Sequence, residues 1–255
     1  MKWDKDGWPI IGNDGKSVDR VLPMPVAGQP ATFPAASAEF DNRQPYYAIS
    51  DSPSQHPEYQ PNGSVLRPEW QWNHNPDNRY WSLTDRKGWL RLKSGWIVKG
   101  IRDARNTLTQ RTVGPWSAAH TRVDVSGLRN GDCAGLASYQ NQYGFVGVER
   151  CDDQLRIVMR RARQKGDAEG VMVASIPLSQ NVVYLKVCCD FRNKTDKAIF
   201  FYSLDGQDWH SIGDALQMAF DWPDFVGQRF ALFYYSTEQC GGHADFDFYK
   251  VNYHN

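Results

Sequence analysis

The chain has 255 residues, which is enough to bury a substantial core in one large β domain or in two smaller units. Its 29 basic residues equal its 29 acidic residues, and this balance argues against nucleic acid or an anionic membrane as the main partner. The sequence has no run of about eighteen apolar residues that predicts a transmembrane helix, and its N-terminus lacks the apolar core of a secretory signal, so we expect either a cytoplasmic chain or a piece of a longer one.

Proline content divides the sequence. Eleven of the fourteen prolines lie at or before Pro76, and proline lacks the backbone donor that a central strand needs. Residues 1–36 are predicted to be an irregular extended segment, with a short hairpin-like piece in residues 7–18 followed by a linker. Residues 39–63 are rich in Pro, Ser, Asn and Gly, which predicts a long surface loop.

Short runs of β-branched, aromatic and aliphatic residues predict strands in the rest of the chain. Many of these runs alternate, so that Leu90 and Leu92 are expected to face one way while Trp89 and Arg91 face the other. The predicted strands lie within residues 89–94, 106–113, 121–128, 134–140, 143–150, 155–163, 183–191, 198–204, 209–213, 229–236 and 244–253.

Turn residues and the scarcity of helical patterns complete the fold prediction. Asp205-Gly206 lies between two predicted strands and indicates a tight hairpin whose two central residues both have positive φ. Residues 214–220 are the best helix candidate and would make barely two turns. Many short strands without helices predict an all-β sandwich of two antiparallel sheets, with about five to seven strands in each.

Common catalytic motifs are absent from the sequence, which has no Gly-rich phosphate loop, G-x-S-x-G, H-E-x-x-H or C-x-x-C. Carboxylate pairs such as Asp152-Asp153 occur, but a glycosidase needs two carboxyls that face each other across the scissile bond, which spacing alone does not show. Asp245 and Asp247 share one face of the last predicted strand. That face is either solvated, or it contributes Asp247 to a structural Ca²⁺ site with Glu39 and backbone carbonyls.

The densest aromatic cluster is "EWQWNHNPDNRYW", residues 69–81. In a strand, Trp70 and Trp72 share one face, while Gln71 and Asn73 share the other. Amides and imidazoles donate and accept hydrogen bonds as hydroxyls do, and an indole offers a flat apolar surface to a pyranose ring. The alternative is that the tryptophans are core residues of the sandwich. Predicted saccharide contacts are Trp72, Asn73, His74, Asn75, Trp81, Tyr139, Gln140 and Tyr143, with Trp116, Asn141 and Tyr235 as further candidates.

A family resemblance rests on these residues and on the runs that follow them. "LRPEWQWNHNPDNRYWSLTDRKGWLRLKS" resembles the start of the C-terminal concanavalin A-like sandwich of glycoside hydrolase family 43 enzymes, which is also classed as carbohydrate-binding module family 91. The resemblance continues through "NGDCAGLASYQNQYGFVGVER" and closes with "VGQRFALFYYSTEQCGGHADFDFYKVNY". It implies a concanavalin A-like, jelly-roll type sandwich in residues 37–255. Residues 1–36 resemble the last strand pair of the family's propeller with its linker.

The resemblance also implies a function. The family's catalytic acids lie in the propeller, and none is matched here, so we expect a non-catalytic module that recognises β-1,4-xylan or xylo-oligosaccharides. Two alternatives are an unrecognised xylosidase or arabinofuranosidase site in the sandwich, and a purely structural domain that completes a propeller. Expected partners are xylan and a family 43 propeller domain, with no nucleic acid, no membrane and no required cofactor. The parent protein is expected to be bacterial.

Overall fold

The computed structural model describes residues 2–10, 35–41, 64, 66–67, 69–163, 167, 169–220 and 226–254. The chain divides into two units, Met1–Phe33 and Pro34–Asn255. The boundary lies before residue 36 because the next residues already bind the sandwich: Ala36 exchanges two hydrogen bonds of 2.9 Å with the side chain of Gln110. Most of the predicted linker and most of the predicted surface loop of residues 39–63 lie outside the described residues.

The first unit contains a small hairpin. Strands β1 (Lys2–Trp3) and β2 (Pro9–Ile10) pair in antiparallel register. Between them, the carboxylate of Asp4 accepts backbone N–H bonds from Asp6 at 2.9 Å and from Trp8 at 2.8 Å. A hairpin therefore forms at residues 2–10, whereas residues 11–18 of the predicted hairpin-like piece lie outside the described residues.

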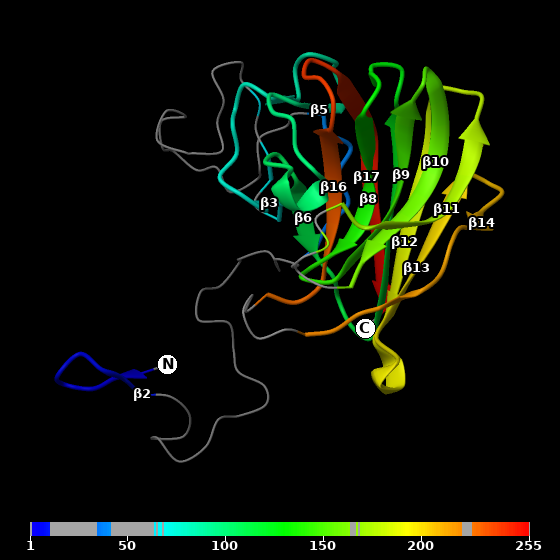
Figure 1. Cartoon of the computed structure of the whole chain (residues 1–255). Helices are drawn as coiled ribbons and strands as arrows, with labels where there is room; N and C mark the ends of the chain where they lie inside the picture. Colours follow the sequence, from blue (N-terminus) through cyan, green and yellow to red (C-terminus); the bar gives the residue numbers. More distant parts are fainter. Residues whose placement is uncertain are drawn as a thin grey trace. The chain divides into compact units, whose positions relative to one another are not determined.

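The second unit is a sandwich of two antiparallel sheets (Figure 1). The seven-stranded sheet has the order β11 (Val171–Leu178), β10 (Gln154–Ala162), β9 (Tyr143–Cys151), β8 (Asp132–Tyr139), β16 (Arg229–Ser236), β6 (Leu108–Arg111) and β3 (Gln71–Trp72). The eight-stranded sheet has the order β14 (His210–Ser211), β13 (Lys197–Ser203), β12 (Val182–Asp190), β7 (Trp116–Asp124), β17 (His243–His254), β5 (Leu90–Lys93) and β4 (Trp81–Ser82), with β15 (Leu216–Gln217) also paired to β13. The predicted all-β sandwich is confirmed, with one strand more than expected in the second sheet.

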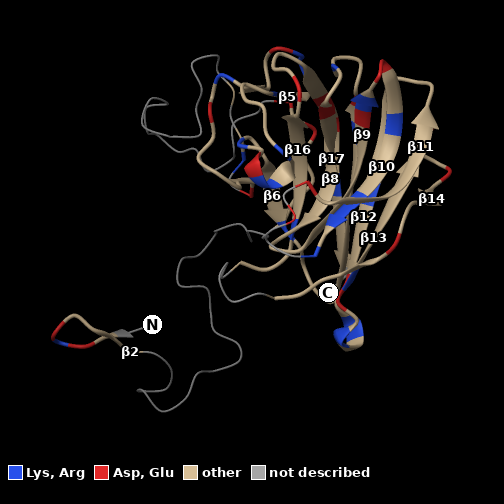
Figure 2. Ribbon diagram, in the orientation of Figure 1, with Lys and Arg blue, Asp and Glu red and all other residues tan. Residues whose placement is uncertain are grey.

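The helices of the described residues are two short 3₁₀ turns, η2 (Ile101–Asp103) and η3 (Arg192–Lys194). Within that part of the chain, no helix is long and apolar enough to cross a membrane. Charged residues of both signs are interspersed over strands and loops (Figure 2), as the balanced composition predicts.

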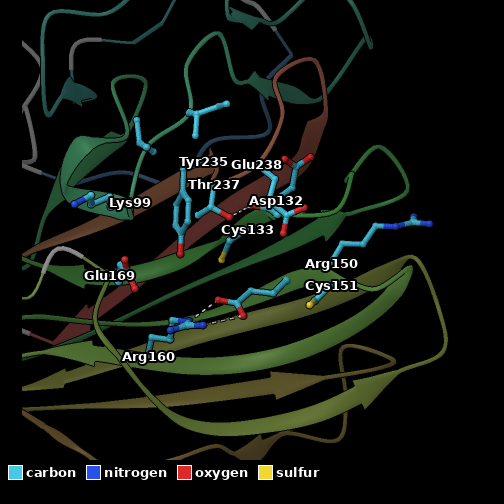
Figure 3. A pocket seen from close by; sticks show the side chains of 14 residues that line it. Lys99, Asp132, Cys133, Arg150, Cys151, Arg160, Glu169, Tyr235, Thr237 and Glu238 are labelled. Atoms are coloured by element: carbon cyan, nitrogen blue, oxygen red, sulfur yellow. Dashed lines mark hydrogen bonds and ion pairs between the residues drawn. The ribbon is translucent and has the colours of Figure 1, made fainter.

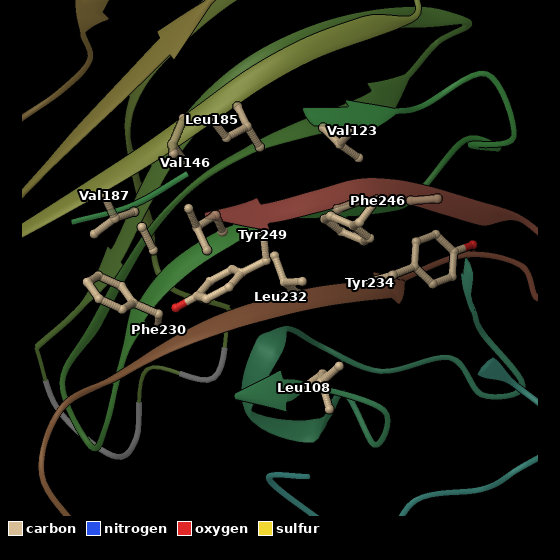
Figure 4. Packing of buried hydrophobic residues seen from close by; sticks show 14 of the residues in the cluster. Leu108, Val123, Val146, Leu185, Val187, Phe230, Leu232, Tyr234, Phe246 and Tyr249 are labelled. Carbon is tan, nitrogen blue, oxygen red and sulfur yellow. The ribbon is translucent and has the colours of Figure 1, made fainter. Parts of the chain in front are cut away.

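The main core lies between the two sheets (Figure 4). It forms because successive residues of a strand point to opposite faces. In β12, Leu185 and Val187 are fully buried, whereas their neighbours are partly exposed. They belong to one apolar cluster with Val146 of β9, Leu232 of β16 and Phe246 of β17.

A second apolar layer covers the outer face of the seven-stranded sheet. Residues 94–107, called here the crossing segment, connect β5 of one sheet to β6 of the other and carry η2. Ile101 and Ala104 of this segment pack on outward-facing side chains of β8, β9, β10 and β16. As a result, every residue of β8 is buried, on both faces of the sheet. The cluster contains Ile101, Ala104, Cys133, Ala137, Tyr139, Tyr143, Phe145, Val158, Ala162, Ala231, Phe233 and Tyr235.

Two local predictions are corrected by the structure. The hairpin between β13 and β14 exists, but its loop spans residues 204–209 and Gly206 is at φ 82° without a positive φ at Asp205. The Asp205 carboxylate instead accepts backbone N–H bonds within the loop. Residues 214–220 are not helical, because Leu216 and Met218 are both buried at the two-residue spacing of an extended segment.

Candidate functional site

The two indoles predicted to form a sugar platform face the core. β3 pairs with β6 so that Trp72 lies opposite Leu108, which is fully buried between the sheets. The ring of Trp72 packs 5.1 Å from that of Trp81, and Trp81 is 1% exposed. Its indole N–H also donates to the side-chain oxygen of Asn78 at 3.0 Å. The structure therefore corrects the platform prediction for Trp72 and Trp81, since these rings close the edge of the core.

Three other predicted residues meet on the outer face of the seven-stranded sheet. Asn73 donates from Nδ2 to the hydroxyl of Tyr139 at 3.2 Å, and its Oδ1 accepts from Arg229 Nη2 at 2.7 Å. The rings of Tyr139 and Tyr143 stack 6.0 Å apart. Burial raises the pKa of Tyr143, so its phenol stays neutral. The structure brings these three predicted residues together, but they are engaged with one another or buried.

The remaining predicted contacts hold loops in place. His74 is exposed, and its Nε2 lies 2.7 Å from the carbonyl oxygen of Arg102 in the crossing segment. Arg105 Nε donates to the carbonyl oxygen of Asn75 at 2.7 Å. Gln140 is 3% exposed and donates to a backbone carbonyl at 2.6 Å. Of the further candidates, Trp116 lies in the other sheet, the carbonyl of Asn141 accepts from Arg102, and Tyr235 faces a hollow described next.

A hollow of about 600 Å³ opens over the outer face of the seven-stranded sheet. Its volume falls within the range typical of small-ligand sites. In Figure 3, Tyr235 lies between Lys99 and Glu169 on one side and Cys133 and Thr237 on the other. The residues come from β8, β9, β10, β16 and four loops, and they are Ile97, Val98, Lys99, Gly131, Asp132, Cys133, Glu149, Arg150, Cys151, Arg160, Glu169, Tyr235, Thr237 and Glu238.

An ion pair lines the hollow. Arg160 of β10 donates from Nε to Glu149 Oε1 at 2.5 Å and from Nη2 to Oε2 at 3.3 Å, so the pair is bidentate. The two side chains are 22% and 17% exposed, which leaves part of each in contact with the hollow. A carboxylate has about four acceptor positions and a guanidinium five donors, so the pair retains capacity for the hydroxyl groups of a ligand.

The thiol of Cys133 and the phenol of Tyr235, which line the hollow, are unreactive. Burial raises the pKa of Cys133 and that of Tyr235 well above their ordinary values, so both groups are neutral at neutral pH. A neutral, fully buried thiol is a poor nucleophile. This arrangement can bind a ligand by apolar contact and hydrogen bonds, but these two groups are unsuited to nucleophilic chemistry.

The carboxylate pair Asp152-Asp153 has a structural role. These residues form the two-residue turn between β9 and β10, where Cys151 pairs with Gln154. Their φ angles are 48° and 60°, as a tight hairpin requires. In addition, the backbone N–H of Asp153 donates to the side chain of Asn130 at 2.9 Å.

The two residues predicted to bind Ca²⁺ lie next to basic side chains. Asp247 accepts from Arg122 at 2.9 Å, while Glu39 lies 4.0 Å from Lys250. The neighbouring Asp245 is bound on both oxygens by arginines. Calcium requires several unneutralised oxygen ligands, so Asp247 and Glu39 do not fit such a site. Among the described residues, no group of three or more His, Cys, Asp or Glu side chains could hold a metal ion.

Comparison with known proteins identifies the domain. Residues 61–252 match the family described as the β-xylosidase C-terminal concanavalin A-like domain. The chain belongs to this family. The match covers most of the sandwich and confirms its concanavalin A-like class as well as the resemblance to glycoside hydrolase family 43 proteins.

Individual relatives agree with this family assignment. A β-xylosidase of Formosa agariphila is 28% identical over 97% of this chain and 41% of its own length. A putative β-xylosidase of Xylanibacter ruminicola is 30% identical over 86% of this chain and 35% of its own. A solved bifunctional GH43-CE protein of Bacteroides eggerthii is 44% identical, with a TM-score of 0.72, over 85% of this chain and 27% of that one. The family 43 domain thus spans less than half the length of the relatives it matches.

Proposed function

We propose that residues 34–255 form a non-catalytic accessory domain that binds xylan-type saccharides, and that the hollow on the outer face of the seven-stranded sheet is the binding site. The observation that carries the proposal is the hollow itself, in a member of a β-xylosidase domain family. It combines an aromatic ring, the Glu149–Arg160 pair and hydroxyl and charged groups at its rim, which suits a neutral ligand rich in hydroxyls.

Two features of the site support binding without catalysis. Both oxygens of Glu149 are engaged by Arg160, whereas a retaining or inverting glycosidase needs one carboxyl free as a proton donor and a second across the bond. The Cys133 thiol and the Tyr235 phenol are buried and neutral. In addition, the overall net charge of zero fits a neutral saccharide as the ligand of the hollow.

Calorimetry with xylohexaose, together with retardation in xylan gels, tests the proposal. Lys99→Ala and Thr237→Val each remove one hydrogen-bonding group from an exposed rim residue, and we expect each to weaken binding roughly two- to tenfold. Glu149→Gln should weaken it by about tenfold, because the charged hydrogen bonds that hold Arg160 are lost as well. Lys87→Ala, at an exposed loop position between β4 and β5, is the matched control.

Absence of heat and of gel retardation with every xylan would contradict the proposal, as would rim variants that bind like the wild type. Assays on nitrophenyl xyloside and nitrophenyl arabinofuranoside address the enzymatic alternative. We expect no turnover, and turnover that stays with the protein through purification and disappears in Glu149→Gln would replace binding with catalysis. A domain that binds no saccharide but binds a separately supplied propeller would have the structural role instead.

A further inference from the structure

A row of basic and aromatic side chains crosses the outer face of the eight-stranded sheet. Lys250 of β17 pairs with His120 of β7, which pairs with Lys186 of β12, which in turn pairs with Phe201 of β13. Because these are directly opposite positions on adjacent strands, their side chains share one face. This row, called here the Lys186–Lys250 row, is on the opposite side of the sandwich from the hollow.

Aromatic rings surround the basic groups of the row. The ammonium of Lys186 lies 3.9 Å from the ring centre of Trp209 and 4.9 Å from that of Phe201. The ammonium of Lys250 lies 4.7 Å from the ring centre of Phe248. The imidazole of His120 contacts Phe248 and Trp209 edge-on, with centroid separations of 5.6 Å and 6.0 Å. The rings thus hold both ammonium groups near the same imidazole.

Acidic partners are scarce in this row, unlike elsewhere on the same face. One end of the sheet pairs its charges closely, with Arg122 at 2.9 Å from Asp247. In the Lys186–Lys250 row, the described residues place no carboxylate within ion-pair distance of Lys186, and Lys250 has only Glu39 at 4.0 Å. Lys186 of β12 and Lys250 of β17 flank His120 of β7, and like charges gathered on one face repel one another, so an anion between them would be favourable.

We propose that the Lys186–Lys250 row binds the carboxylate of an acidic saccharide, such as a uronic acid branch on a xylan-type chain. A carboxylate would accept charge-assisted hydrogen bonds from the two ammonium groups, and the rings of Trp209 and Phe248 would offer apolar surface to the C–H groups of the sugar. The saccharide nature of the ligand rests on the proposed function, whereas the carboxylate follows from the basic row itself.

The choice of a saccharide over an acidic peptide follows from the mixture of groups. Four aromatic side chains, Trp209, Phe201, Phe248 and the nearby Tyr184, are partly exposed around the row. A pyranose ring with an apolar C–H face and one carboxylate matches this combination of flat apolar surface and paired cations. Peptide recognition instead uses pockets for alternating side chains or backbone hydrogen bonds at a strand edge.

The test compares two ligands that differ in one group. The first is a xylo-oligosaccharide with a single glucuronic acid branch, and the second is the same molecule with its carboxylate reduced to the alcohol. By calorimetry, the acidic ligand should bind about tenfold more tightly, as expected for charge-assisted hydrogen bonds. The difference should shrink at high salt, because these groups are partly exposed.

Variants locate the effect on the protein. Lys186→Met keeps the apolar stem and removes the charge, and it should bring the acidic ligand close to the affinity of the reduced one. Lys250→Met, at a more exposed position, is a second variant with less risk to folding. Lys87→Met is the matched control and should bind like the wild type.

Several results would overturn the inference. Equal affinity for the two ligands, or unchanged binding of the acidic ligand by both lysine variants, removes the carboxylate site. A polyglutamate peptide that binds as tightly as the acidic saccharide would show a site for acidic peptides instead. Weaker xylohexaose binding by Glu149→Gln, with the acidic preference intact, supports both sites. Absence of xylohexaose binding in the wild type, with that preference intact, contradicts the proposed function alone.

Discussion

The outer faces of the two sheets are built differently. On the seven-stranded sheet, β8 is buried at all of its positions because the crossing segment packs over it. On the eight-stranded sheet, β12 alternates strictly between buried and partly exposed residues. The sequence of a strand that is covered on both faces is a continuous run of small and apolar residues. The sequence of a strand with one solvent-exposed face alternates between apolar and polar residues. The residue pattern along a strand therefore indicates whether one face or both faces of the strand are covered.

The largest expected effect distinguishes the two faces by stability. Phe233 is fully buried under the crossing segment, with its ring 4.7 Å from that of Phe145. Phe233→Ala should lower the free energy of unfolding by about 3–5 kcal/mol, as for other large core truncations. Phe201→Ala, at an outward position of the open face, should cost less than about 1.5 kcal/mol. Denaturant unfolding measures both, and equal losses would mean that the two faces are equally covered.

A second contrast lies within the open face, where carboxylates differ in burial. Asp245 is 3% exposed and is bound by Arg91 at 2.7 and 2.8 Å and by Arg86 at 3.0 Å. Asp245→Asn removes the bidentate partner of Arg91 and leaves Arg86 with Asp124 alone, and it should cost about 2–4 kcal/mol. Asp247→Asn removes a single contact to Arg122 from a half-exposed pair and should cost less than about 1 kcal/mol. A reversed order would show that the network at Asp245 is not a stabilising element.

The smallest expected effect concerns pH. Burial, and then the charges of Lys250 and Lys186, lower the pKa of His120 below its ordinary value of 6.5. The unfolded chain therefore binds this proton more readily, so the contribution of His120 to stability is complete above about pH 6.5 and is lost as the pH falls through the lowered pKa.

We expect His120→Gln to flatten the decline in the free energy of unfolding between about pH 7 and about pH 5. Some decline should remain, because burial, and then the charge of Arg91, also lower the pKa of His243. Denaturant unfolding at each pH, on both proteins, isolates the His120 part as a difference. Parallel profiles for the two proteins would contradict the expectation.

Alternation within single strands was enough to predict most of the fold. Leu90 and Leu92 are fully buried, whereas Arg91 faces outward, as their spacing predicts. β11 is not predicted, because it is an edge strand whose small residues and Pro177 dilute the pattern. A two-residue spacing also places Trp70 and Trp72 on one face but does not say which face. That depends on the pairing of β3 with β6, which is set by residues far away in the sequence.

The hollow could not be predicted by the same reasoning. Glu149 of β9 lies directly opposite Arg156 of β10, and Arg160 lies four residues further along that strand, so the hairpin register alone does not predict the Glu149–Arg160 ion pair. Tyr235 joins them only through the strand order β10-β9-β8-β16, and Lys99 only through the path of the crossing segment. Such long-range connections leave no local signature.

The crossing segment has one more consequence. Its residues 97–99 form part of the wall of the hollow, its Ile101 seals the second apolar layer, and its ends are anchored in different sheets. A ligand that fills the hollow would contact the same segment of backbone that connects the two sheets. Occupancy and resistance to local opening should therefore rise together, so that amide hydrogens of residues 97–104 exchange more slowly when saccharide is bound.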